Sequence, residues 1–260
     1  IIYYLPDNFH SQLSISIIDS AGQVVRVLNQ DNTKTLSVKP GLNRVVWDLR
    51  DEGIPELPDV SGGQSPFIAK KTSILSLPGT YTIRLIIGNE SISEQSFDFV
   101  KDPRSEVSLD DLVLQYDLQK DIQKKSLEIF NKVKYFRKIR DEVKQVMLRS
   151  KGLDQENDLK KSVDLMFSKL SEIENEIVPF KSFNKIPPVG IPVGLYGKYK
   201  ELKGGVGGGD YRPTKQSYEL FKDLNLRLET NFSEIDEIFN NDKFGVFKLV
   251  KELDIPDFSL

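Results

Sequence analysis

The stretch that decides the fold is PGLNRVVWDLRDEG, residues 40–53, which contains the only tryptophan of the chain, Trp47. Three acidic residues follow it closely: Asp48, Asp51 and Glu52. The group has two interpretations, an aromatic platform beside a glycosidase carboxylate pair, or a buried strand followed by a turn. Side chains alternate between the faces of a strand, so Val45 and Trp47 share one wholly apolar face. We therefore predict that Trp47 lies in the core of a β-domain.

The sequence on both sides of this stretch carries further strand patterns. In QLSISIID (12–19), apolar and polar residues alternate, which is typical of a half-buried strand. Gly22 follows in a predicted hairpin turn. Further strands are predicted at 1–5, 24–28, 42–49, 79–87 and 92–100. Six or seven short strands in about 100 residues indicate an immunoglobulin-like antiparallel β-sandwich over residues 1–103.

The LPGTY segment, residues 77–81, contains a Pro-Gly pair that is typical of a type II turn. In such a turn Gly79 takes a positive φ, which other residues adopt at a cost of about 1–2 kcal/mol. Together with Trp47, we assign Gly79 and Tyr81 structural roles, and we predict no catalytic residue in the chain.

The pattern changes near residue 103, beyond the predicted hinge DPR (102–104), to apolar residues at helical spacing. Ser108 is the predicted N-cap of the first helix, and Pro213 is predicted in the first turn of a later one. Helices are expected at 108–150, 155–178 and 213–240, with a short fourth at 245–253. Residues 104–260 are therefore predicted to form an antiparallel helical bundle of three main helices, and the fold class to be α+β.

A Pro/Gly-rich loop is predicted between these helices, at residues 183–212. A loop of this length inside a compact unit is often a binding segment. Its glycine run, KGGVGGGD (203–210), lacks the Gly-Lys-Ser/Thr of a phosphate-binding loop and is interpreted as a flexible connector. Its apolar part and the flanking tyrosines are the candidate partner-docking segment. The residues of this segment are Ile186, Val189, Ile191, Val193, Leu195, Tyr196, Tyr199 and Tyr211.

Composition excludes several functional classes. The 260 residues include 36 basic and 39 acidic side chains, so the net charge of −3 gives no general attraction for nucleic acid. There is no cysteine and one histidine, His10, so thiol chemistry and multi-histidine zinc sites are excluded. We expect no metal site and no cofactor. No apolar run approaches the ~20 residues of a membrane span.

Three segments carry a family resemblance: IIYYLPDNFHSQLSISIIDSAGQVVRVLN (1–29), GLNRVVWDLRDEG (41–53) and LPGTYTIRLIIGNESISEQSFDFVKDPR (77–104). In this order they resemble the C-terminal end of bacterial proteins with sortilin-like, BNR/Asp-box β-propellers, often labelled glycosyl-hydrolase-like. The helical tail also looks similar, including a Pro-Thr helix start such as Pro213-Thr214. The β-part further resembles the immunoglobulin-like domain of the flagellar hook-capping protein, which shares the Trp-Asp and Pro-Gly-x-Tyr signatures.

The resemblance implies a β-propeller upstream of residue 1, and the start of the chain, IIYYL, already reads as strand without a preceding Met. No Asp-box motif occurs in this sequence, so the propeller's activity is not carried over to any residue here. We expect a non-catalytic accessory module of a secreted or envelope-associated protein, which packs on the propeller or on another envelope protein. Two alternatives are a carbohydrate hydrolase that uses Asp48 and a carbohydrate-binding module that uses Tyr196 and Tyr199.

Overall fold

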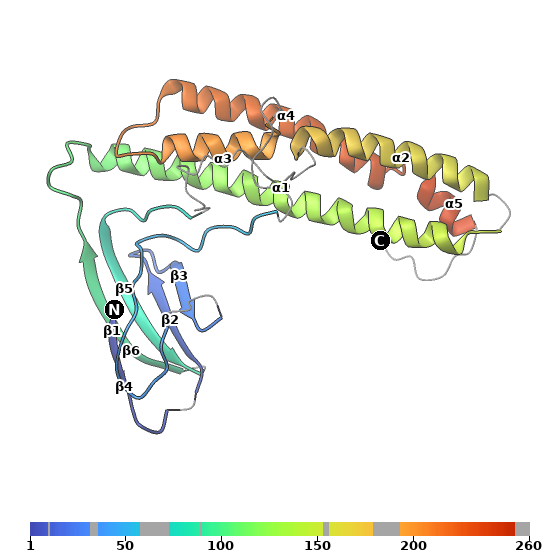
Figure 1. The fold of residues 1–260 in the computed structure, drawn as a ribbon. Helices are drawn as coiled ribbons and strands as arrows, with labels where there is room; N and C mark the ends of the chain where they lie inside the picture. Colours follow the sequence, from blue (N-terminus) through green and yellow to red (C-terminus); the bar gives the residue numbers. More distant parts are fainter. Residues whose placement is uncertain are drawn as a thin grey trace. The chain divides into compact units, whose positions relative to one another are not determined.

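The computed structural model describes residues 1–9, 11–31, 36–57, 73–88, 90–152, 156–178 and 193–252, with residues 90–92 described by their backbone. In this part of the chain the fold is α+β, as predicted, with two antiparallel sheets and five helices (Figure 1). No helix in the described ranges combines the length and the apolar character needed to cross a bilayer.

The chain divides into two compact units. Of the described residues, those within 1–54, 73–120 and 207–213 form unit 1, and those within 55–57, 121–206 and 214–252 form unit 2. The predicted boundary at residue 103 differs from this division, because the first turns of the long helix and the end of the glycine run both belong to the β-rich unit.

Unit 1 contains two sheets, one of two strands and one of four (Figure 1). In the two-stranded sheet β1 (Ile2–Leu5) pairs with β4 (Gly41–Arg44). The four-stranded sheet has the order β3-β2-β5-β6. Its strands are β2 (Leu13–Ile18), β3 (Val24–Asn29), β5 (Gly79–Ile87) and β6 (Glu90–Phe99). Both sheets contribute to one apolar core, which includes Leu5 of β1, Ile15 of β2 and Tyr81 of β5.

Strand β2 lies at the centre of this core. Leu13, Ile15 and Ile17 are buried, as the alternating pattern predicts. Ser16 and Ile18 on the opposite face are buried as well, so the predicted half-buried strand is in fact covered on both faces. Strands β3 and β5 pair with its two edges, so β2 is an interior strand of the four-stranded sheet.

The strand before the tryptophan is shorter than predicted. We expected a strand at 42–49, but β4 ends at Arg44. The next residue, Val45, exchanges two backbone hydrogen bonds with Ile1. The alternation of side chains nevertheless continues: Val45 and Trp47 are buried, whereas Val46 is 67% exposed. The predicted burial of the Trp47 side chain is therefore confirmed, although its backbone is outside the ladder.

The two glycine predictions have opposite outcomes. Gly22 has a φ of 79°, in the hairpin where the Asp19 carboxylate accepts hydrogen bonds from the backbone N–H groups of Ala21 and Gln23. Gly79 does not have a positive φ, so the predicted type II turn geometry is wrong. It is instead the first residue of β5, at the start of the predicted strand 79–87, and its extended backbone pairs with Phe99 in the ladder.

The long helices match their predicted ranges closely. Helix α1 (Leu109–Arg149) begins after the predicted N-cap, and the Ser108 hydroxyl accepts a hydrogen bond from the N–H of Asp111. The remaining long helices are α2 (Glu156–Ile177) and α4 (Lys215–Phe239), and the short C-terminal helix is α5 (Val246–Glu252). Pro213 lies before the N-cap of α4, not in its first turn, because Thr214 caps the N–H of Ser217.

One helix falls where a loop was predicted. Helix α3 (Leu195–Val206) occupies part of the 183–212 segment, and its last residues include Gly204 and Gly205 of the glycine run. Within unit 2 it contacts α2 and α4, and α2 also contacts α4 and α5 (Figure 1). Burial of Leu195, Tyr196 and Tyr199 stabilises a helix that its glycines disfavour, so tertiary packing outweighs local propensity here.

Candidate functional site

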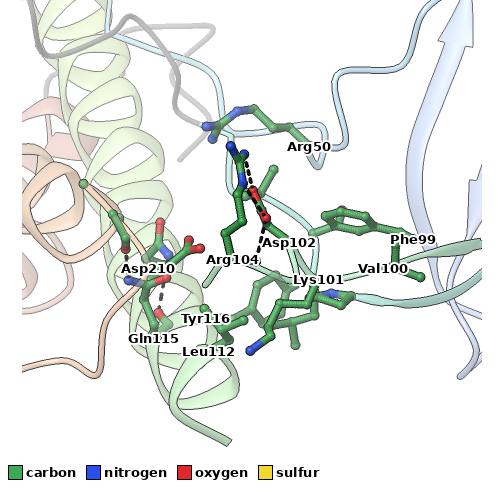
Figure 2. Close-up of a pocket in the computed structure, with 18 of the residues that line it drawn as sticks. Arg50, Phe99, Val100, Lys101, Asp102, Arg104, Leu112, Gln115, Tyr116 and Asp210 are labelled. Atoms are coloured by element: carbon green, nitrogen blue, oxygen red, sulfur yellow. Dashed lines mark hydrogen bonds and ion pairs between the residues drawn. The ribbon is translucent and has the colours of Figure 1, made fainter. Parts of the chain in front are cut away.

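A cavity of ≈ 730 Å³ lies wholly within unit 1. Five parts of the chain line it: Arg50, residues 75–78 before β5, residues 99–104 from the end of β6 onward, one face of the first turns of α1, and the glycine segment 207–210 (Figure 2). Its volume is in the range of small-molecule and peptide sites, about 300–1,000 Å³. This cavity is the candidate functional site.

Five charged side chains contribute to the lining of the cavity: Arg50, Lys101, Asp102, Arg104 and Asp210. The Arg104 guanidinium makes a two-point interaction with the Asp102 carboxylate, at 3.1 Å from Nε and 2.7 Å from Nη2. This interaction lowers the pKa of Asp102, since the hydrogen bonds favour the charged form. Arg50 donates from Nη1 to the Ser73 carbonyl at 3.3 Å. In Figure 2 the guanidinium groups of Arg50 and Arg104 point toward one another.

The ammonium group of Lys101 holds the chain that leads from β6 into α1. It donates to the carbonyl oxygens of Ser105 at 2.9 Å and Val107 at 2.6 Å, both just before the helix. These are backbone acceptors in a connecting segment, and a lysine that binds them fixes its course. Lys101 therefore positions one wall of the cavity as well as contributing a positive charge.

The glycine segment is held against α1 by one amide side chain. Gln115 donates from Nε2 to the carbonyl oxygens of Gly209 at 2.7 Å and Tyr211 at 3.1 Å. The sequence interpretation of this run as a flexible connector missed the contact, which joins residues more than ninety positions apart. Because Gly207, Gly208 and Gly209 line the cavity without side chains, their backbone is accessible to a ligand.

A polar group of α1 connects the cavity wall to the tryptophan stretch. Tyr116 lines the cavity, and burial raises the pKa of its hydroxyl even though the Lys120 ammonium opposes the shift. Burial acts to lower the pKa of Lys120, but its hydrogen bond to Asp51 and the charge of that carboxylate outweigh burial, so the pKa is raised. The contribution of this ion pair to stability is present below the ordinary lysine pKa and is lost as pH rises through the raised value.

Asp51 has a structural role that accounts for both of its carboxylate oxygens. Oδ1 accepts hydrogen bonds from the N–H groups of Ile74 at 2.7 Å and Gly53 at 3.1 Å, and Oδ2 lies 2.8 Å from Lys120 Nζ. The side chain is almost fully buried. These contacts are those of a residue that fixes a loop, and they leave Asp51 without an acid/base role.

We predict that Asp51→Ala lowers the free energy of unfolding of unit 1 by about 2 kcal/mol, because the buried N–H of Ile74 loses its acceptor. Urea titration followed by Trp47 fluorescence measures this change. The matched control is Asp48→Ala, at an exposed acid of the same stretch, which should change stability by less than about 0.5 kcal/mol. Equal effects of the two substitutions would contradict the structural role of Asp51.

Trp47 lies in an aromatic cluster within the core. Its ring centroid is 5.4 Å from that of Tyr81 and 6.2 Å from that of Phe97, both in edge-on arrangements. The indole N–H donates to the Arg50 carbonyl at 2.8 Å, and the Tyr81 hydroxyl donates to the Leu77 carbonyl at 2.6 Å. Every polar atom of these two buried side chains thus has a backbone partner, and the residues keep the structural roles assigned to them.

The predicted docking residues are distributed over both units. Ile186, Val189 and Ile191 lie outside the described residues. Val193 is half-buried in unit 2, and Tyr211 is 40% exposed in unit 1, next to the glycine segment. Docking through these residues stays a prediction.

Three of the docking residues lie in the interior of unit 2. Leu195, Tyr196 and Tyr199 are buried on helix α3, so they pack within the unit instead of forming a surface. The same burial removes Tyr196 and Tyr199 from the surface on which a carbohydrate-binding platform would have to lie. The Tyr199 hydroxyl donates to Asn225 Oδ1 at 2.7 Å. Burial, with a smaller effect from the Glu56 carboxylate, raises the pKa of Tyr196 to about 12. Apolar spacing alone did not distinguish a buried helix from an exposed apolar segment.

Sequence reasoning did not find the cavity, because its walls come from segments that carry no shared motif. The DPR hinge and the glycine run were each interpreted as connectors, and they line the same cavity. Within the described ranges no group of three His, Asp or Glu side chains is placed to hold a metal ion.

Comparisons with protein-family models, with curated proteins and with solved structures gave no match for this chain.

Proposed function

We propose that this chain is a non-catalytic interaction module, an immunoglobulin-like β-sandwich followed by a helical bundle, of a secreted or envelope-associated bacterial β-propeller protein. Its role is to pack on the propeller or on a partner protein. The observation that carries the proposal is an exposed apolar face on the two-stranded sheet, defined here as the β1–β4 face. Four large side chains form it: Ile2 (68% exposed), Tyr4 (66%), Leu42 (77%) and Val46 (67%).

The β1–β4 face is produced chiefly by β1, whose residues are apolar on both sides, together with Leu42 of β4. On β1, Tyr3 and Leu5 point into the core while Ile2 and Tyr4 point outward. Tyr4 lies directly opposite Leu42 in the ladder, so their side chains are neighbours on the outer side. Strands with two apolar faces are typical of sheets that are covered on both sides. A clustered exposed apolar surface of this kind marks a site of protein association.

The occupant that we propose for the β1–β4 face is the β-propeller that the sequence resemblance implies. The face begins at Ile2, so a domain joined to this chain through residue 1 would emerge beside it. The backbone of Ile1 is hydrogen-bonded to Val45, which fixes the direction of that junction. A short tether gives the docked domain a high effective concentration, so a modest apolar contact suffices to keep it in place.

Two further observations support an immunoglobulin-like module without catalysis. The hydroxyl of Tyr81 bonds to the backbone four residues upstream, a contact similar in kind to the tyrosine corner of immunoglobulin-like domains. Beside the acids that would serve a glycosidase at Trp47, the indole is in the core, and Asp51 is engaged with backbone N–H groups.

The test is association of the chain with the propeller segment of the parent protein, expressed separately and measured by titration calorimetry. We expect Leu42→Asp to raise the dissociation constant about tenfold or more, because a charge replaces an apolar contact in a desolvated interface. Leu42 is exposed, so the folded state should keep its thermal stability.

The matched control is Val24→Asp, which places the same charge at a 57% exposed valine of β3, in the other sheet. It should leave association unchanged. Equal affinities for Leu42→Asp and the unmodified chain would refute the docking face, and a parent gene without a propeller ahead of Ile1 would refute the occupant. If the chain hydrolyses a member of a glycoside panel and the Asp48→Asn variant does not, the hydrolase alternative is established instead.

A further inference from the structure

We propose that the cavity of unit 1 binds the C-terminal residue of an extended polypeptide, with its α-carboxylate on Arg50 and Arg104 and its apolar side chain on the opposite surface. This inference deepens the proposed function, on which it rests, by assigning a second, peptide-binding site to the interaction module. It uses a different face of unit 1 from the β1–β4 face, so the two are tested separately.

The charges that line the cavity favour an anionic group. Three cationic side chains and two anionic ones contribute to the lining, which leaves one positive charge in excess in a chain whose net charge is −3. Arg104 is paired with Asp102, whereas among the described residues the Arg50 side chain makes a long hydrogen bond, from Nη1 to the Ser73 carbonyl. Arginine presents a planar fork of donors that matches a carboxylate.

Arg104 is able to take part because its pairing is exposed. Its side chain is 88% exposed and that of Asp102 is 44% exposed, so exchange of one carboxylate for another costs little in water. The guanidinium groups of Arg50 and Arg104 point toward one another in Figure 2, which places a potential carboxylate position between two like charges.

The remaining lining is suited to an apolar side chain. Besides the charged groups, the cavity is lined by apolar residues of three separate segments. They include Leu75, Leu77 and Pro78 before β5, Phe99 and Val100 after β6, and Leu112 of α1. An apolar surface with a few placed polar groups is the usual composition of a ligand site. A carboxylate next to an apolar group is the chemistry of a polypeptide's last residue.

The sheet edge beside the cavity favours a polypeptide over a small apolar acid. Strand β6 is an edge strand, bonded only to β5 among the described residues, and it runs directly into the cavity wall at Phe99. Val100, which follows, is 73% exposed and also lines the cavity. An extended peptide that adds to a free edge gains main-chain hydrogen bonds, and a pocket at the end of the edge then recognises its terminal residue.

The experiment uses an array of octapeptides with free C-termini that end in Leu, Phe, Asp or Lys, each also made as the C-terminal amide, probed with the fluorescently labelled full chain. We expect binding to free acids that end in Leu or Phe. The dissociation constant of the best binder is then measured by fluorescence polarisation. Amidation should raise it about tenfold or more, because the amide lacks the charge-assisted hydrogen bonds of the carboxylate.

Arg50→Gln should weaken binding of the free acid by a similar factor and leave binding of the amide unchanged. Arg104→Gln provides a second variant at an exposed position where folding is not at risk. The matched control is Arg44→Gln, an exposed arginine of β4 that does not line the cavity, which should bind like the unmodified chain.

Equal affinity for acid and amide, or no bound peptide on the array, would overturn the proposal. If the chain binds a glycan array and the Arg50→Gln variant does not, the proposal is overturned as well and the cavity is assigned to carbohydrate. Arg50→Gln is expected to leave association with the propeller unchanged, and Leu42→Asp to leave peptide binding unchanged, so failure of one site is distinguishable from failure of the other.

Discussion

Replacement of Glu174 by alanine is expected to lower the free energy of unfolding of unit 2 by about 3–5 kcal/mol. Glu174 of α2 is only 2% exposed, and its two carboxylate oxygens pair with two arginines of α1. Oε1 lies 2.7 Å from Arg137 Nε, and Oε2 lies 2.7 Å from Arg140 Nη2. Both guanidinium groups are themselves mostly buried, with side chains 22% and 16% exposed.

The size of the expected effect comes from the charges that are left behind. Without the carboxylate, two guanidinium groups in a poorly solvated site lose the anion that they share. The ion triad itself is weak evidence of net stability, because desolvation offsets most of its attraction. Replacement of the whole triad by apolar residues, as in Arg137→Met, Arg140→Leu and Glu174→Leu together, should therefore recover most of the loss.

Urea unfolding followed by far-UV circular dichroism measures this prediction, because unit 2 is helical. Glu172→Ala is the matched control on the same helix, since Glu172 is 68% exposed and forms a long ion pair with Lys169 at 3.6 Å. Its expected effect is below about 1 kcal/mol. A similar loss of stability in the Glu172 and Glu174 variants would show that the buried triad is not the source of the effect.

Trp47→Ala is the second substitution with a large expected effect, a loss of about 3–5 kcal/mol from the free energy of unfolding of unit 1. The indole fills space in a core that both sheets share and contacts the rings of Tyr81 and Phe97. Its removal leaves a cavity and also an unpaired carbonyl at Arg50. A domain with a total stability of about 5–15 kcal/mol would be close to unfolding.

Circular dichroism is the suitable measurement for this variant, because the substitution removes the only tryptophan fluorophore. Trp47→Phe keeps an aromatic ring but not the hydrogen bond, so it should lose less than the alanine variant does. Val46→Ala, at the exposed neighbour, should change stability by less than about 0.5 kcal/mol. A Trp47→Ala variant as stable as Val46→Ala would place the indole outside the core.

The sequence was most informative where one local pattern repeats over many residues. The apolar spacing of α2 predicted both its range and its buried face, since Leu159, Val163, Met166 and Leu170 are all buried. On α4, Leu224 and Leu228 are buried, whereas Leu220 is 45% exposed.

The sequence by itself determined the α+β class, the long helices, and the burial of Trp47, because each follows from side-chain periodicity within a single segment. Only the tertiary structure decided that 195–206 is a helix and that 207–210 forms a cavity wall with Arg50, Lys101 and α1. The physical reason is that local propensities are weak beside burial and long-range hydrogen bonds, such as that from Gln115 to Gly209. Contacts of this kind join residues whose separation along the chain carries no pattern.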